Sequence, residues 1–201
     1  MPFLVAIGKQ VILVPYEKEH VRKYHKWMKS PYLQEMTGSE SLSLDEEYEM
    51  QQSWRTDKDK CTFIVLSKDP NTEVKNSDLH ETSRMIGDVN FYLNNTDNPH
   101  EAELGVMIAE EQYAGKGAAT EVLHLMMQYA VNDIGVNEFV VRIKDTNDAS
   151  IHIFMNKLGF KETERAYAFQ EVTLRRKVCD DLKASLNEWT SHARRIKYAL
   201  E

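Results

Sequence analysis

The chain has 201 residues, which suits one well-packed domain and is short for two. Its formal net charge of −7 argues against nucleic acid as a partner, because contacts to a phosphate backbone need a basic face. No segment approaches the roughly 20 apolar residues of a membrane span, and no basic stretch precedes the apolar N-terminus, as it would in a secretory signal. We therefore expect a cytoplasmic protein with neither a nucleic-acid nor a membrane partner.

The first half of the chain predicts three strands and two helices. Residues 9–15 are rich in β-branched side chains and predict a strand. Apolar residues at helical spacing over 17–30 predict an amphipathic helix, and Ser43 with Glu46 forms a capping-box pattern at the start of a second helix. Composition predicts two further strands and a long, mobile hairpin loop between them: 61–66, 85–93 and 67–84.

Strands and helices continue to alternate in the second half, and the segments are 101–111 (strand), 118–131 (helix), 137–145 (strand), 147–158 (helix, closed by Gly159) and 166–178 (one or two strands). Residues 179–201 predict a polar C-terminal helix. The alternation predicts one α/β (α+β) domain over 1–178, with a mixed sheet of about six to seven strands flanked by helices, and a helical C-terminal extension over 179–201. Cys61 and Cys179 match no disulfide or metal spacing, and we expect both to be buried as small apolar residues.

The stretch "YAGKGAATE" stands between a predicted strand and a predicted helix. The first N–H groups of a helix have no partner within it, and the helix dipole makes that end positive. Small residues leave these N–H groups uncovered, so that a phosphate can approach the backbone. The stretch is neither a Walker loop nor a dinucleotide fingerprint, and on glycine content alone a simple turn explains it equally well.

A second motif, "NDASIHIFMNKLGF", follows after one strand, and the pair resembles the GNAT superfamily of acetyl-CoA-dependent N-acetyltransferases. That family carries Gln/Arg-x-x-Gly-x-Gly/Ala before a helix and Asn-x-x-Ser with Lys-Leu-Gly-Phe on the next one. Two registers place the first motif, Ala114 to Ala119 or Gln112 to Gly117. We favour the first, because Thr120 and Glu121 then continue into the helix as in family members. The resemblance covers residues 9–178 and implies the family's fold, with acetyl-CoA as cosubstrate and no metal.

The resemblance also implies the residues that hold acetyl-CoA. Backbone amides near a bulge in the fourth strand reach the thioester carbonyl, the small-residue loop holds the pyrophosphate, and the later helix lies beside the CoA arm. At Phe154 many family members have a tyrosine that protonates the CoA sulfur, so here that role passes to water or another group, or the chemistry is slow. The implied cofactor-binding residues are Met107, Ile108, Ala109, Ala114, Gly115, Lys116, Gly117, Ala118, Ala119, Thr120, Asn147, Ser150 and Phe154.

Glu103 is the candidate general base. It alternates to the same face of its strand as Gly105 and Met107, so its carboxylate is expected to point at the cofactor cleft and to take the ammonium proton through a water. Glu101 is the second choice. A solvated or ion-paired surface acid explains Glu103 equally well.

The acceptor is expected to be a cation. Residues 31–60 hold eight acids against three bases, although a solvated helix face explains such a run too. An α-amine with a pKa near ~7.8 is far more often neutral at pH 7 than a lysine near ~10.4, which favours an N-terminal amine.

Three kinds of function stay open: a protein N-acetyltransferase, an acetyltransferase for a small amine such as a polyamine, and a catalytically weak acetyl-CoA-binding protein that acts by docking. The long loop over 67–84 and the helical tail favour protein partners. In detail the chain resembles the N-acetyltransferase 9 branch, whose members are associated with tubulin and microtubule stability, so tubulin is the partner that the resemblance implies.

Overall fold

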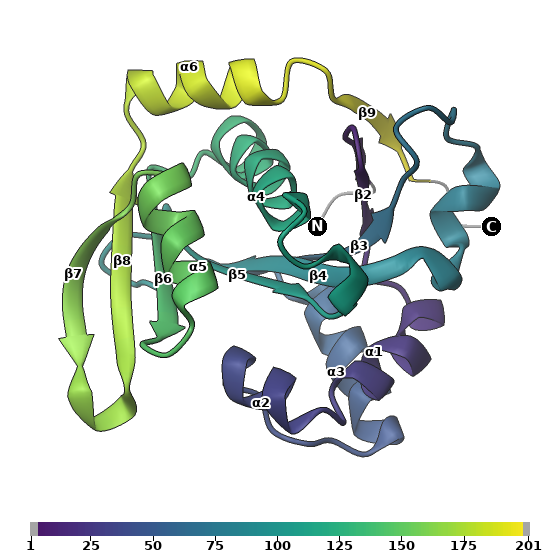
Figure 1. Ribbon diagram of the computed structural model, residues 1–201, viewed down its shortest axis with the longest axis horizontal. Coiled ribbons are helices and arrows are strands. Elements are labelled where there is room, and N and C mark those ends of the chain that lie inside the picture. The colour runs from purple at the N-terminus through teal and green to yellow at the C-terminus, as the bar shows by residue number, and fades with distance from the viewer. Residues whose placement is uncertain (1–3, 199–201) are drawn as a thin grey trace.

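A mixed sheet of nine strands forms the centre of the computed structural model, which describes residues 4–198 (Figure 1). The strand order is β7-β8-β6-β5-β4-β3-β2-β1-β9. The strands are β1 (Leu4–Ile7), β2 (Val11–Pro15), β3 (Lys60–Ser67), β4 (Met85–Tyr92), β5 (Glu101–Ile108), β6 (Glu138–Lys144), β7 (Lys161–Ala166), β8 (Glu171–Lys177) and β9 (Arg194–Lys197). Neighbours pair antiparallel except β5 and β6, which pair parallel. The predicted α/β class with a mixed sheet is confirmed.

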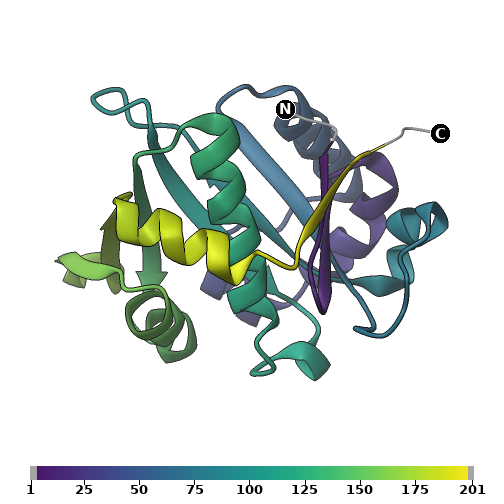
Figure 2. The same ribbon diagram turned by 90° about the horizontal axis from the view of Figure 1, so that it is seen from above.

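Helices cover both faces of the sheet (Figures 1 and 2). One face carries α1 (Val21–Trp27), α2 (Pro31–Thr37) and α3 (Leu44–Thr56), and the other carries α4 (Ala118–Tyr129), α5 (Asp148–His152) and α6 (Asp180–Trp189). Strand alternation divides the core accordingly. In β2, Val11 and Leu13 join the core under α4, whereas Ile12 and Val14 join the core under α1 and α3.

Local sequence signals start and end several helices as expected. The predicted capping box of α3 is present, since Ser43 N–H donates to Glu46 Oε2 at 2.7 Å and Glu46 N–H donates to Ser43 Oγ at 3.4 Å. α5 continues through a π-helical turn, Ile153–Lys157, and Gly159 follows with φ +66°. A left-handed residue at this place is what a helix end favours, and glycine adopts it without strain.

β5 and β6 separate along their length, and this opening positions the site. They pair only from Glu101 to Glu103 against Glu138 to Val140. β5 then runs on to Ile108, held by β4 on its other side. The second half of β5 therefore has an edge without a neighbouring strand, inside the sheet.

The number of strands differs from the expected six to seven because β1, β7 and β9 were not recognised. β7 reads "KETERA" and β9 reads "RRIK", and charged side chains are typical of strands at the edge of a sheet. Among the described residues the tail is helical over Asp180–Trp189, so the prediction of a helix over 179–201 is wrong for residues 190–198, where β9 forms instead. Residues 1–3 and 199–201 of the two predicted parts lie outside the described residues.

The loop over 67–84 is a hairpin connection, as predicted, but it has its own structure. It contains 3₁₀ turns at Asn76–His80 and Thr82–Arg84. Leu79 is buried, and His80 Nδ1 lies 2.9 Å from Glu19 Oε1. These contacts anchor the loop to the segment before α1. Of the two cysteines, Cys61 is buried as expected, whereas Cys179 is exposed at the start of α6, where the expectation was wrong. No helix among residues 4–198 is long and apolar enough to cross a membrane.

Candidate active site

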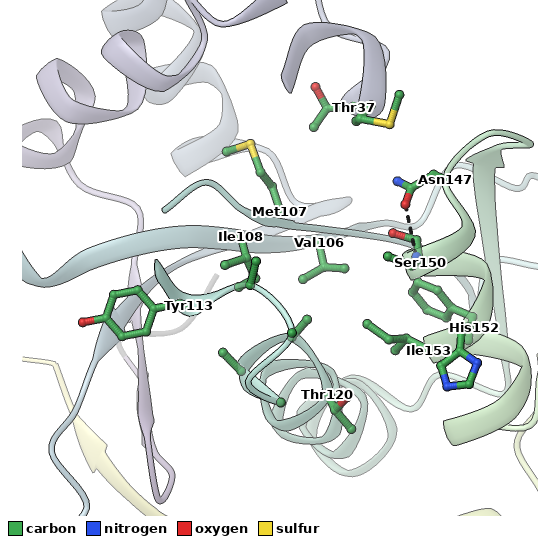
Figure 3. A pocket seen from close by; sticks show the side chains of 18 of the residues that line it. Thr37, Val106, Met107, Ile108, Tyr113, Thr120, Asn147, Ser150, His152 and Ile153 are labelled. Atoms are coloured by element: carbon green, nitrogen blue, oxygen red, sulfur yellow. Dashed lines mark hydrogen bonds between the residues drawn. The ribbon is translucent and has the colours of Figure 1, made fainter. Parts of the chain in front are cut away.

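A mostly apolar cavity of about 490 Å³ lies between β5, the loop before α4, and α5 (Figure 3). We call it the apolar cavity. Ala109 and Lys116 of the predicted cofactor-binding set do not line it. The other members of that set do: Met107, Ile108, Ala114, Gly115, Gly117, Ala118, Ala119, Thr120, Asn147, Ser150 and Phe154.

The loop before α4 presents open backbone amides to this cavity. Gly115 and Gly117 have φ of +69° and +86°, values that only glycine adopts without strain. The first hydrogen bond of α4 runs from Glu121 N–H to Gly117 C=O at 3.1 Å, so the amides of the first helical turn precede any helical acceptor. The loop geometry favours the register from Gln112 to Gly117, because its two glycines hold the left-handed positions, whereas Ala119 lies inside α4.

The edge of β5 that faces the opening offers backbone groups of Val106 and Ile108. Ala109 N–H donates to Ile86 C=O on β4 at 2.8 Å, so it is not available to a ligand. Successive residues direct their backbone groups to opposite edges of a strand, which turns those of Ile108 and Val106 away from β4. Val106 lines the apolar cavity and was missed in the sequence, because its side chain is that of an ordinary apolar strand residue.

Gly87 lets the backbone of β5 come close to β4 at this point. A Cβ atom at Gly87 would lie 1.9 Å from the carbonyl oxygen of Met107 and 3.0 Å from the Cα of Ile108. No side chain fits there without moving β5. Glycine at position 87 therefore fixes the course of β5 where it borders the opening.

The start of α5 forms the opposite wall. Asn147 caps the helix, with its Oδ1 accepting from Ser150 N–H at 3.1 Å (Figure 3). Phe154 is 1% exposed and packs edge-to-face on Phe160, with ring centroids 5.1 Å apart. Both observations fit a rigid wall, with Phe154 as a packing residue that carries no exchangeable proton.

A second, mostly polar cavity of about 340 Å³ adjoins the first, and we call it the polar cavity. The two share Val106, Met107 and Phe154 among their lining residues. In Figure 3 the Met107 side chain points towards Thr37 of α2, while Val106 and Ile108 point towards α4. The opening between β5 and β6 thus has an apolar cavity on the α4 side and a polar one on the α1–α3 side.

Polar side chains from neighbouring strands form the floor of the polar cavity. Lys60 pairs with Tyr92 across β3 and β4, Asn90 pairs with Gly105 across β4 and β5, and Asp88 pairs with Met107. Side chains of such cross-strand pairs lie on the same face of a sheet. The floor of the polar cavity is therefore Lys60, Asp88, Asn90 and Tyr92, with Gly105 leaving it open.

Asp88 and Lys60 are both buried, at 3% and 1% exposure. Burial raises the pKa of Asp88 to about 6, and the hydrogen bond from Asn90 Nδ2 at 3.0 Å and the nearby Lys60 oppose that rise. Burial lowers the pKa of Lys60 to about 7. The Lys60 ammonium stands 3.3 Å from the ring centroid of Trp54 and 3.5 Å from that of Tyr92, a cation–π arrangement on both sides.

Glu103 lines the polar cavity and not the apolar cavity, although it was expected to point at the cofactor cleft, and it has a cationic partner. Its Oε2 is ion-paired with Arg142 Nη1 and accepts a hydrogen bond from Asn94 Nδ2 at 3.3 Å. Glu101 is buried and ion-paired with Arg175. The role of Glu103 as general base stays a prediction. The ion pair with Arg142 opposes that role, because it stabilises the carboxylate without its proton.

Sequence reasoning missed Asp88, Lys60 and Asn90. The available signal was polar residues at every second position of "DVNFY" and "KCT", which usually indicates a solvated strand face. Only the cover of α1 and α3 turns this face into a buried one. Among residues 4–198, no group of three or more His, Cys, Asp or Glu side chains is arranged to hold a metal ion.

The residues that line the site fit a CoA thioester, which has a pyrophosphate, a long arm and a thioester carbonyl. Amides at the start of a helix suit a pyrophosphate, the apolar cavity suits an extended arm, and the free edge of β5 suits a polarised carbonyl. These features describe an acyltransferase that uses an acyl-CoA.

Comparison with known proteins gives the family. The profile "Acetyltransferase (GNAT) domain" matches residues 10–161. The chain is 45% identical to "Alpha/beta-tubulin-N-acetyltransferase 9" of Mus musculus, over 96% of this chain and 78% of that protein. It is 44% identical to the Homo sapiens protein of the same name, over 96% and 92% of the two chains. The chain belongs to the GNAT acetyltransferase family, and it is an acetyl-CoA-dependent N-acetyltransferase.

Solved structures of more distant proteins share the fold. Spermidine N-acetyltransferase from Vibrio cholerae, in complex with CoA and spermine, superposes with a TM-score of 0.69 at 17% identity, covering 88% of this chain and 99% of that one. A ribosomal L7/L12 alpha-N-protein acetyltransferase in complex with coenzyme A has a TM-score of 0.69 at 15% identity, over 86% and 96%. At these identities the likeness supports the fold alone.

Proposed function

We propose that this protein transfers the acetyl group of acetyl-CoA to the N-terminal α-amine of tubulin. The observation that carries tubulin as the acceptor is similarity along nearly the whole chain to proteins named alpha/beta-tubulin-N-acetyltransferase, at 44–45% identity. The cytoplasmic location expected from the sequence, and a reaction without a metal, belong to the same proposal.

An α-amine is favoured over a lysine side chain on chemical grounds. With a pKa near ~7.8, roughly a tenth of an α-amine is neutral at pH 7, whereas a lysine near ~10.4 is almost fully protonated. Glu103, the carboxylate predicted to act as base, is ion-paired, and Phe154 carries no acidic proton. A site of this kind is better suited to the amine that is easier to deprotonate.

Each wall of the two cavities has a distinct task in this reaction. Acetyl-CoA supplies the acetyl thioester. In this proposal the amides of residues 115–120 bind phosphate and α5 orients the CoA arm against Phe154. The backbone N–H groups of Val106 and Ile108, which turn away from β4, donate to the thioester carbonyl. The polar cavity admits the acceptor amine from the α1–α3 side.

The test uses peptides that match the N-termini of α- and β-tubulin, with acetyl-CoA and the purified chain. The same peptides with a blocked α-amine and an internal lysine are the matched controls, and spermidine represents small amines. We expect mass increases of one acetyl group at the α-amine of the free peptides. Acetylation of spermidine alone would support a polyamine enzyme, and acetyl-CoA binding without any transfer would support a docking protein.

A further inference from the structure

Asp88 lies opposite the place where the two cavities meet. It pairs with Met107, a residue that lines both cavities, and cross-strand neighbours have Cβ atoms about 5 Å apart. Its carboxylate faces the polar cavity, from which an acceptor would enter. No cation lies within ion-pair distance of Asp88 among the described residues, in contrast to Glu103 and Glu101.

The surroundings of Asp88 hold its carboxylate in one orientation. Asn90 Nδ2 donates to Asp88 Oδ2 at 3.0 Å, which leaves Oδ1 for another donor. A Cβ atom at Gly105 would lie 3.1 Å from Asn90 Oδ1, so the glycine keeps the floor clear beside this pair. Lys60, held between Trp54 and Tyr92, lies near the carboxylate without contacting it, and in its ammonium form it adds a positive charge there.

We propose that Asp88 is the group that accepts the proton of the acceptor ammonium, with Asn90 and Lys60 as its positioning residues. This inference rests on the proposed function for the nature of the acceptor. Lys60 and Asp88 come from adjacent strands and share a face with the residues that line the opening, so they act on the acceptor side and leave the apolar cavity to the thioester.

The N–H bond of the ammonium breaks, its proton passes to Asp88, and the nitrogen lone pair becomes free to attack the thioester carbonyl. The new C–N bond forms, the C–S bond breaks, and the second nitrogen proton goes to the sulfur through water. Asp88 returns its proton to solvent through the polar cavity, so one proton is released for each acetyl group transferred.

A pKa near 6 suits this role, because such a carboxyl is mostly ionised at pH 7 and still basic enough to take a proton. The titratable groups that face it are Lys60 from β3, Tyr16 after β2 and Tyr24 from α1. Glu47 of α3 lies behind the two tyrosines, and Glu103 with Arg142 lies across the polar cavity. Lys60 is the cation among them that lowers the pKa of Asp88.

The experiment compares Asp88→Asn with Glu103→Gln, using the tubulin peptide or any other α-amine peptide that the wild type acetylates. Asp88→Asn keeps the shape and can still accept from Asn90. We expect kcat/KM at pH 7 to fall about 100- to 10,000-fold, at least about tenfold more than in Glu103→Gln, with acetyl-CoA affinity retained. Asp181→Asn, an exposed carboxyl on α6, controls for the loss of one charge.

The pH profile separates a chemical role from a structural one. The acidic limb of kcat/KM should move from near 6 in the wild type to the pKa of the amine itself, near ~7.8, in Asp88→Asn. Lys60→Met, which removes the cation but keeps a similar volume, should shift the limb upwards and restore the rate at higher pH. An unchanged limb in Asp88→Asn, or a larger loss in Glu103→Gln, overturns the proposal.

A binding measurement tests the role of Asp88 independently of the acceptor that the protein acetylates. With CoA in place of acetyl-CoA there is no turnover, and calorimetry compares a free-amine peptide with its N-acetylated form. We expect the wild type to prefer the free amine and Asp88→Asn to lose that preference. The same result without acetylation of tubulin peptides would remove tubulin as acceptor and retain Asp88. Equal affinities in the wild type would contradict the role of Asp88.

Discussion

Glu47 is a buried carboxyl whose ionised form is destabilised in the folded protein. Its side chain is 1% exposed on α3, and Oε2 has no hydrogen-bond partner among the described residues. The Nδ1 atom of His25 lies 3.8 Å from Glu47 Oε1, a contact that is an ion pair only when the imidazole carries a proton. Burial raises the pKa of Glu47 to about 7. Between pH 4.5 and 7, therefore, the Glu47 carboxyl is mostly protonated in the folded protein and mostly ionised in the unfolded chain.

Glu47→Gln should stabilise the protein in a pH-dependent way. Because the folded pKa is raised, the contribution of Glu47 to stability falls as pH rises from about 4.5 to about 7 and is constant above. The free energy of unfolding of Glu47→Gln relative to wild type should therefore increase over that range, by about 3–4 kcal/mol. Urea unfolding at pH 5, 6, 7 and 8 measures it.

Glu46→Gln on the same turn of α3 is the control, because Glu46 is exposed and its pKa is lowered by the capping box. The contribution of Glu46 to stability is lost only as pH falls below about 4.5, so the difference between Glu46→Gln and wild type should stay constant from pH 5 to 8. If Glu47→Gln and wild type changed in parallel from pH 5 to 8, the pKa of Glu47 would not be raised by folding.

The loop before α4 is the element on which the cofactor site depends. Gly117→Asn and Gly117→Asp have the same shape, so both meet the same strain at φ +86°, and they differ by one negative charge. We expect Asp to weaken acetyl-CoA binding about tenfold or more beyond Asn, because its carboxylate stands beside the phosphates. Isothermal titration at two salt concentrations measures the difference, which should shrink at high salt.

Equal affinities of the two variants would mean that the pyrophosphate lies elsewhere. A variant outside the cavity, Lys116→Ala, should matter less than either, since Lys116 does not line it.

The sequence patterns predict most helices and strands of this fold, and the elements that they miss have identifiable physical causes. Buried strands such as β3 and β4 carry continuous apolar or alternating patterns and were predicted. β7 and β9 lie at the two edges of the sheet, so their side chains are charged and resemble loop or helix. α2 spans only seven residues and buries no side chain fully, so no periodicity marks it.

The candidate site divides in the same way. Loop chemistry at Gly115 and Gly117 is local and can be read from sequence, because positive φ demands glycine. The polar floor depends on which strands are neighbours and on what covers them, and a single segment does not contain that information. Asp88 reads as a surface residue until α1 and α3 are placed over it.

At the scale of the whole molecule, the C-terminal segment ties the two halves of the sheet together. α6 lies across α4 (Figure 2), with Trp189 stacked on His124 at 4.2 Å between ring centroids. Beyond α6, His192 Nε2 lies 3.1 Å from Glu121 Oε1, and Glu121 also accepts from Lys9 N–H and Gln10 N–H. These contacts reach the first turn of α4, so the tail supports the helix that begins the cofactor site. The division of the chain at 178/179 stays a prediction.

The pairing of β1 with β9 brings the beginning and the end of the chain side by side, with Leu4 opposite Lys197. Residues 4 and 197 are therefore neighbours on adjacent strands, and we expect that joining residue 201 to residue 1 through a glycine-serine linker is tolerated. A circular backbone limits the unfolded chain far more than the folded one, and the ideal gain is of order 5 kcal/mol. We expect a higher melting temperature with unchanged acetyl-CoA affinity, against a linear chain that carries the same linker.

A circular chain whose melting temperature is no higher than that of the linear form would mean that the two ends separate in solution. If the ring is more stable, new ends could be opened in the turn between β7 and β8, giving a permuted chain whose order of synthesis differs and whose active site is the same.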